Sequence, residues 1–179
     1  GTIATSGVGS VSLTTSRNIV LVSGSSLSTV DGGVSLNANV AGSATGDFVG
    51  IDADNVTVQT TGTGDISLIG SGGDGVGMGS HIGVFLHNGT SVLSTLAGAT
   101  AGTIGIVGTG GEGTSDNSGV EITDATTIVQ SVGGDISIAG SGANGSGTGN
   151  HGAIVQNAGS VSSTGSAGVA ITGSATTGN

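Results

Sequence analysis

Short apolar pairs alternate along the chain with stretches of glycine, serine and threonine. Ile136 and Ile138 form one such pair, with a single polar residue between them, and further apolar positions stand about eight residues apart, at Ile128 and Val120. Alternate side chains of a β-strand point to opposite faces, so each pair predicts a short strand with one buried face. The residues between the pairs are turn formers. The pattern therefore predicts short strands joined by tight turns.

The apolar positions fall into three interleaved series, which indicates a coil with three sides. The first side starts at Ile19, Gly50 with Ile51, Val84, Val120 and Ala153; the second at Ile3, Leu27, Val58, Val92, Ile128 and Val161; the third at Val11, Val34, Ile66, Ile104, Ile136 and Val169. Three units of about eight residues give a coil of about 24, a period typical of solenoids.

This coil length predicts an all-β fold, a right-handed parallel β-helix with three short strands per coil. A left-handed helix built from hexapeptides would have about 18 residues per coil, since each of its three sides takes six. Residues 1–179 hold about five coils. We expect them to form a single β-solenoid segment, an excerpt of a much larger repeat protein.

Two columns of turn residues accompany the strands. Small polar residues follow the first side at Ser23, Asp54, Asn88, Asp124 and Asn157, and small residues follow the third side at Ala38, Gly70, Gly108, Gly140 and Gly173. Asn, Asp and Gly accept left-handed backbone geometry at turns. We therefore expect both columns to stand at corners of the coil.

Glycine-rich insertions interrupt the coil between the third side and the next first side. They span residues 70–81, 108–119 and 140–151, with a shorter one near 37–47. Insertions at one corner of successive coils stack on one another. We expect a ridge of loops along one edge of the molecule.

Composition and charge exclude several classes of partner. The chain has forty glycines but 34% hydrophobic residues, more than a disordered linker carries. Arg17 is its one basic residue against eleven acidic ones, so we expect no binding to nucleic acid and no insertion into a membrane. Cysteine is absent, so neither disulfides nor thiolate metal sites hold the fold.

The stretch GVEITDATTIVQSVGGDISIAGSG resembles the repeats of filamentous-haemagglutinin-type adhesins and of giant bacterial surface proteins. The resemblance implies a rod-like passenger region of an exported bacterial protein, at the cell surface or extracellular. We expect a structural and adhesive rod without enzymatic activity, possessing no catalytic or cofactor-binding residue. Its expected partners are neighbouring coils or copies of the same protein end to end, and a host-cell or matrix glycan or receptor.

Acidic residues in the insertions are candidate calcium ligands. Asp74, Glu112 and Asp116, with Asp47 in the shorter insertion, offer carboxylate oxygens in flexible backbone, as Ca²⁺ requires. The nonapeptide calcium repeat reads Gly-Gly-x-Gly-x-Asp, and GGEGTSD has its aspartate one place late. A calcium-stabilised solenoid of the RTX type is therefore an alternative, and our main expectation is no cofactor.

A second alternative is a β-helix that binds or cleaves glycans. Asp52, Asp54, Asp65 and Asp135 are its candidate carboxylates, because such enzymes use a paired acid and base. Asp65 and Asp135 are two coils apart. His81, His87 and His151 match no metal-binding motif, so we assign them no metal.

The outward positions of the first side form an uneven, partly apolar stripe. It contains Val20, Phe85, Glu121 and Ile154, beside the predicted ridge of loops. Exposed apolar patches mark interaction sites. This predicts either a docking surface for another rod, a glycan or a receptor, or a stripe covered by the glycine-rich loops folding back over it.

Overall fold

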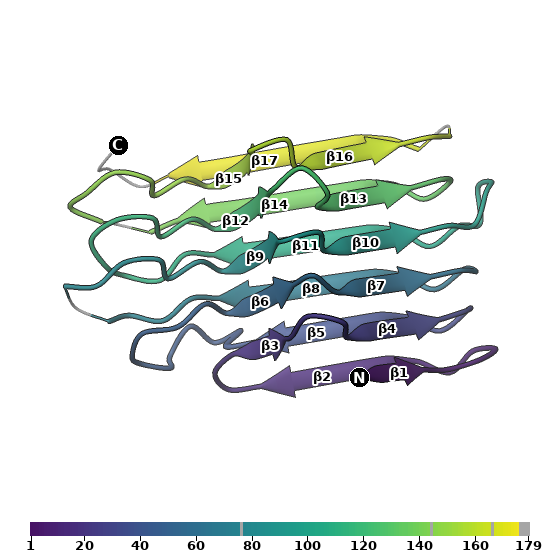
Figure 1. Cartoon of the computed structure of the whole chain (residues 1–179), viewed down its shortest axis with the longest axis horizontal. Coiled ribbons are helices and arrows are strands. Elements are labelled where there is room, and N and C mark those ends of the chain that lie inside the picture. Colours follow the sequence, from purple (N-terminus) through teal and green to yellow (C-terminus); the bar gives the residue numbers. More distant parts are fainter. Residues whose placement is uncertain (76, 144, 166, 176–179) are drawn as a thin grey trace.

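The computed structural model describes residues 1–75, 77–143, 145–165 and 167–175, which form a β-solenoid of about five turns. Each coil contributes one strand to each of three parallel sheets, and the coils stack on one another (Figure 1). The described residues form no helix, and hence none that could span a membrane. The predicted all-β solenoid with three strands per coil is confirmed.

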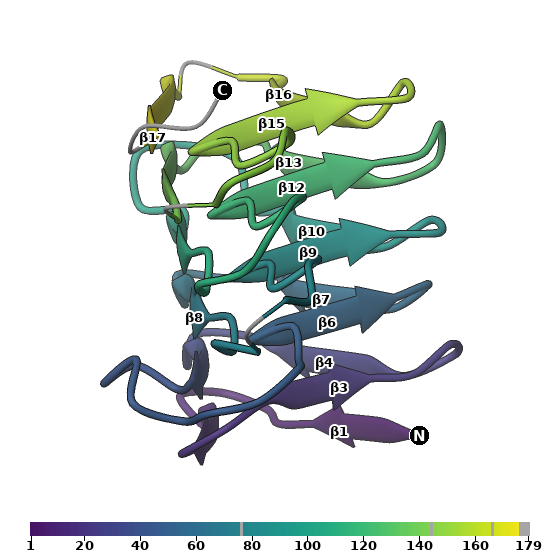
Figure 2. The same cartoon turned by 90° about the vertical axis from the view of Figure 1, so that its left-hand side faces the viewer.

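We name the three sheets A, B and C. Sheet A, the second side, contains β1 (Thr2–Ala4), β4 (Ser26–Thr29), β7 (Thr57–Thr60), β10 (Ser91–Ser94), β13 (Ile128–Ser131) and β16 (Ser160–Ser163). Sheet B, the third side, contains β2 (Val11–Thr15), β5 (Val34–Ala38), β8 (Ile66–Ser71), β11 (Ile104–Thr109), β14 (Ile136–Gly142) and β17 (Val169–Ala175). Sheet C, the first side, contains β3 (Ile19–Leu21), β6 (Ile51–Asp54), β9 (Val84–His87), β12 (Val120–Thr123) and β15 (Ala153–Gln156). Figure 2 shows sheet C stacked along the molecule, with sheet B at its edge.

The register of sheet B is the predicted one, but two predicted positions in the other sheets are wrong by one residue. In β6, Ile51 rather than Gly50 pairs with Ile19, so the buried pair is Ile51 and Ala53. In β13, Val129 pairs with Val92 and is fully buried, whereas Ile128 points outward. Both errors arise where two neighbouring residues could each start the alternating pattern, which leaves the register to the adjacent coils.

Small aliphatic side chains fill the inside of the coils. Leu36, Leu68, Ile106 and Ile138 stand in register in successive strands of sheet B, and each is at most 1% exposed. Burying one such side chain stabilises the fold by about 1.5–3 kcal/mol. The repetition of these columns in every coil makes the three sheets one continuous apolar core.

The turn after sheet C adopts left-handed geometry, as predicted. Asn88, Asp124 and Asn157 have φ of 54°, 83° and 49°. In the other two coils the predicted residue is wrong by one: Asn55 and Gly24, with φ of 50° and 78°, take the place expected for Asp54 and Ser23. For Asn55 the reason is the later start of β6, which moves the turn with it.

The second predicted turn column stacks in register, but it lies inside the strands of sheet B and not at a corner. Gly108 pairs with both Gly70 and Gly140 in neighbouring coils. A Cβ on Gly108 would lie 2.0 Å from the carbonyl oxygen of Gly119, and one on Gly140 would lie 1.9 Å from that of Gly152. Glycine is required at Gly70, Gly108 and Gly140 because the backbones leading out of sheet B and into sheet C touch there, whereas β5 has Ala38 at the matching position. We call this contact the glycine pinch.

Beyond the glycine pinch, the predicted insertions form a stacked lobe, which protrudes on the left in Figure 1. The loops bond to one another between coils: the Gly111 N–H donates to the His81 carbonyl at 2.8 Å, and Gly113 and Gly145 form a parallel bridge. The predicted ridge of loops at one corner is therefore confirmed.

Candidate functional site

A column of polar side chains fills the inside of the loop lobe. His81, Asn117 and Asn150 stand in successive coils and are at most 1% exposed. The Asn117 Oδ1 accepts from the His81 N–H at 3.1 Å, and the Asn150 Oδ1 accepts from the Asn117 N–H at 3.1 Å and from its Nδ2 at 2.9 Å. These amides satisfy buried backbone donors, which would otherwise be costly. The column is a structural ladder.

His81 links three loops. Its Nδ1 lies 2.6 Å from the Glu112 carbonyl oxygen, and its Nε2 lies 2.7 Å from the Asp47 Oδ1. The ring is fully buried. Both ring nitrogens face oxygen atoms of other loops, so neither points to open space where a metal ion could bind. His81 therefore fastens the lobe from within.

The candidate calcium ligands lie in separate places. Asp74 and Glu112 line one small hollow, where the Asp74 Oδ1 accepts from the Gly46 N–H at 2.9 Å. Asp116 lines a different cleft, and Asp47 is bound to His81. Among the described residues, no three His, Asp or Glu side chains converge as a metal-ligand set. The candidate calcium ligands among the described residues therefore do not form one site.

Two of the candidate glycan-cleaving carboxylates bind the next coil. The Asp65 Oδ1 accepts from the Thr103 N–H at 2.7 Å and its hydroxyl at 2.8 Å, and the Asp135 Oδ1 accepts from the Gly168 N–H at 2.7 Å. Asp31, which was not among the predicted residues, likewise accepts from the Thr63 N–H at 3.1 Å. These aspartates link neighbouring coils at the turn that precedes each strand of sheet B.

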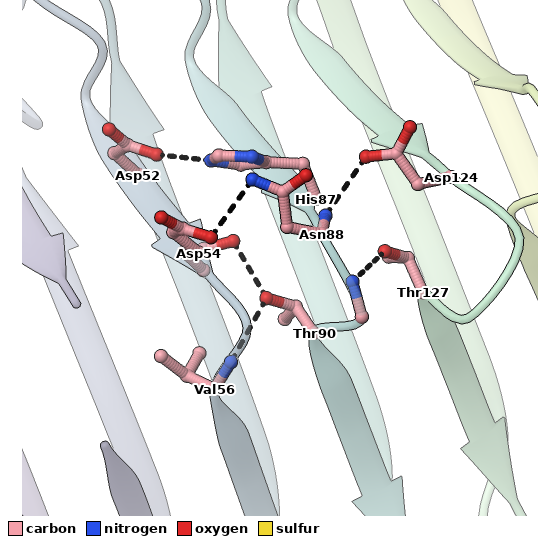
Figure 3. A network of polar contacts seen from close by, with 10 residues as sticks. Asp52, Asp54, Val56, His87, Asn88, Thr90, Asp124 and Thr127 are labelled. Atoms are coloured by element: carbon pink, nitrogen blue, oxygen red, sulfur yellow. Dashed lines mark hydrogen bonds and ion pairs between the residues drawn. The ribbon is translucent and has the colours of Figure 1, made fainter. Parts of the chain in front are cut away.

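The other two candidate carboxylates belong to a polar network at the outer edge of sheet C (Figure 3). The Asp52 Oδ1 lies 2.8 Å from the His87 Nε2, and the Asp54 Oδ1 accepts from the Asn88 Nδ2 at 3.0 Å. The Asn88 N–H in turn donates to the Asp124 Oδ2 at 2.9 Å. The network spans three coils and fixes the outward side chains of β6 and β9.

The predicted docking stripe is a true row of sheet C with one interruption. Val20, Asp52, Phe85, Glu121 and Ile154 pair in sequence across the five strands. Asp52 separates Val20 from the other three predicted residues. The structure therefore brings Phe85, Glu121 and Ile154 together and leaves Val20 apart.

Phe85, Glu121 and Ile154 line a cleft of about 340 Å³ between the outer face of sheet C and the loop lobe. The lobe also contributes Asp116 and His151 to the lining. The volume is at the lower end of the range for small-molecule sites, about 300–1,000 Å³. This cleft is the candidate functional site.

Glu121 is the polar centre of the cleft. Its side chain is half-buried, and its Oε1 accepts from the Gln156 Nε2 at 2.8 Å. Burial raises the pKa of Glu121 and the carboxylates of Asp116 and Asp124 act in the same direction, while the Gln156 hydrogen bond and His151 oppose them. A carboxyl with a raised pKa in a cleft is a common mark of a functional site.

Phe85 is held in place from behind. Its ring stacks on His87, with centroids 4.1 Å apart and an interplanar angle of 12°. Asp52 binds His87 on the adjacent coil (Figure 3). The chain's other phenylalanine, Phe48, is buried under the guanidinium of Arg17. Phe85 is therefore the fixed aromatic surface of the cleft.

Part of the lining was not predicted from the sequence. Gln156 follows Ile154 by two residues in the same strand, so alternation placed it on the same face and could have found it. Asp116, Ser118 and His151 come from loops with no periodic pattern.

No family model, curated protein or solved structure matches the chain.

Proposed function

We propose that this chain is a structural and adhesive rod segment of an exported bacterial surface protein. The observation that carries the proposal is the uniform stacking of its coils, each of which presents to the next the same three strand edges and the same inward apolar columns. Such a stack grows by adding coils, since each coil contacts only its neighbours. Its function is then to extend and to present a surface.

The two ends of the stack support the addition of coils along the stacking axis. Ile3 in β1 and Ile171 in β17 occupy inward columns, yet they are 46% and 45% exposed. Unpaired parallel strand edges are templates for further strands. Either end accepts another coil, supplied by more of the same polypeptide or by a second copy. We propose copies end to end as the partner.

The extracellular and adhesive parts of the proposal rest on the resemblance to surface adhesins and on the cleft. Export in an unfolded state suits a chain without cysteine. The loop lobe places a cleft on one face of every such segment, where a host-cell or matrix glycan or receptor would dock. We propose no enzymatic activity, because the candidate carboxylates Asp52, Asp65 and Asp135 already hold other parts of the fold.

A tandem fusion tests the rod. The longest axis of this segment lies across the coils, so a rod emerges only when the stack is lengthened (Figure 1). Thr15 and Gly173 occupy equivalent positions in sheet B, so residues 1–173 joined directly to residues 16–179 continue the coil in register.

We expect this fusion to form one stack of about twice the height by electron microscopy and small-angle X-ray scattering, with a single unfolding transition. The control joins the same two parts through a flexible Gly/Ser linker, which leaves two separate bodies. A direct fusion that behaves like the linker control would contradict the proposed rod.

Association of copies is tested at the exposed end. Ile171→Lys places a charge on the uncovered inward column of β17 and should abolish concentration-dependent association in sedimentation velocity. Val107→Lys is the matched control, since Val107 is equally exposed, at 45%, but lies on the outer face of sheet B. Equal effects of the two variants would argue against end-to-end contact.

A further inference from the structure

We propose that the cleft beside Phe85 binds a neutral saccharide. The inference rests on the proposed adhesive function and names its ligand class and its site. Three properties of the cleft carry it: a fixed aromatic surface, a set of hydrogen-bonding side chains facing the same space, and the absence of lysine and arginine among the residues that line it.

The apolar wall suits the C–H face of a sugar ring. Phe85, Ile82 and Ile154 line this wall, and the Phe85 ring is held from behind by His87 and Asp52. An aromatic ring carries a negative face that attracts C–H groups, and it binds best when its orientation is fixed before the ligand arrives. The Asp52, His87 and Phe85 contacts give that fixed orientation.

The polar wall suits the hydroxyl groups. Glu121 and Gln156 project from neighbouring strands of sheet C, while Ser118 and His151 come from the lobe. The Glu121 carboxylate uses one oxygen for the Gln156 amide, and its remaining lone pairs can accept from a ligand hydroxyl. This wall therefore offers both donors and acceptors, as a ligand with several hydroxyls requires.

Charge selects among saccharides. Glu121 and Asp116 line the cleft, and the chain's one basic residue, Arg17, lies over Phe48 elsewhere. An anionic sugar would meet the carboxylates of Glu121 and Asp116, and the cleft has no lysine or arginine to balance them beside the single His151 imidazole. Burial also disfavours the charged form of Glu121, which weakens the attraction for a cationic ligand. A neutral saccharide is the class that fits both conditions.

Saturation-transfer NMR with the full chain tests the inference. The neutral probes are cellotriose, chitotriose, mannotriose and lactose, with a heparin tetrasaccharide and spermidine as anionic and cationic probes. We expect saturation transfer to at least one neutral probe, with shifts in the Phe85 ring and Gln156 side-chain resonances. No transfer to any neutral probe, or transfer to spermidine or heparin alone, would overturn the inference.

Three variants locate the binding. Phe85→Ala should weaken binding of the neutral probe about tenfold, and Phe85→Leu, which keeps an apolar side chain without the ring, should fall between. Val20→Ala is the control, since Val20 lies in the same outward row but away from the cleft. Equal effects of Val20→Ala and Phe85→Ala would refute the assigned site. A tandem fusion that forms the lengthened stack but binds no neutral probe would reject this inference and leave the rod standing.

Discussion

The coil core and the loop lobe are two stacks that share one axis and are held together in different ways. In the core, inward columns of Val, Ile and Leu are removed from water in every coil. In the lobe, the buried column is polar, and its order depends on single hydrogen bonds such as that from the His81 N–H to Asn117. Burial of apolar area is tolerant of small shifts, whereas a hydrogen-bond ladder is not. The comparison predicts different responses to substitution.

The largest expected effect lies in the core. Ile106→Ala removes a fully buried side chain from the middle of sheet B, and should lower the free energy of unfolding by about 2–5 kcal/mol. Val107→Ala, the next residue but with an exposed side chain, should change it by less than about 0.5 kcal/mol. Urea unfolding followed by circular dichroism measures both. Similar losses for the two would mean that apolar burial does not hold the core.

The next effect lies at the boundary between the two stacks. Gly108→Ala places a Cβ 2.0 Å from the Gly119 carbonyl oxygen, and the backbone shift it forces should cost about 1–3 kcal/mol. Gly105→Ala is the matched control in the same strand, since its nearest contact lies at 3.9 Å. The same denaturation experiment compares them. If Gly105→Ala were equally damaging, the glycine pinch would not be the cause of the loss.

A smaller and more local effect is expected in the lobe. Asn117→Ala leaves the His81 N–H without its acceptor and should cost about 1–3 kcal/mol, felt mainly as local opening. Amide hydrogen exchange should rise at His81 and Gly111 while the protection of sheet B stays high. Glu112→Ala, an exposed side chain in the same lobe, should leave exchange unchanged. Loss of protection throughout sheet B would show that lobe and core open as one unit.

The smallest expected effect concerns Glu121, where the two stacks meet at the cleft. Its pKa in the folded state is raised above the ordinary 4.5, so the folded chain holds this proton more tightly than the unfolded chain. Its contribution to stability is therefore full below pH 4.5 and is lost as pH rises through the raised value.

Glu121→Gln removes the ionisable group and with it the loss of stability at higher pH. We expect the variant to be more stable than the wild type at neutral pH and to lose that advantage on acidification, in thermal unfolding measured across pH. Ser118→Ala, a change in the same cleft without an ionisable group, should shift stability equally at every pH. A constant difference between Glu121→Gln and wild type would contradict the raised pKa.

The core could be predicted from the sequence because a strand has a strict period of two and each coil repeats the previous one. Where two neighbouring apolar residues made the starting point ambiguous, as at Ile128 and Val129, the pattern alone chose wrongly. The row of Phe85, Glu121 and Ile154 followed from the same alternation.

The position of the lobe at one corner could be predicted, but its internal structure could not, because it follows from individual contacts and not from a period. Asn117 and Asn150 resemble ordinary loop residues in the sequence, yet both are buried. His81 becomes a link between loops only through Asp47 and the Glu112 backbone, which come from other coils. The polar half of the cleft shares this origin, since Asp116 and His151 reach it from the lobe.

The glycine pinch has a consequence for how such a chain can evolve. The coil closes wherever the two backbones touch, whatever length of chain lies outside the contact. In the coils of β8, β11 and β14, where glycine forms the pinch, ten or twelve residues lie between sheets B and C, whereas the first coil, with Thr15 at the matching position, passes from β2 to β3 in three residues. The inward columns remain aligned in all of them. A loop can thus be replaced in one coil at a time, which changes the exposed surface there, while the coils above and below keep their register.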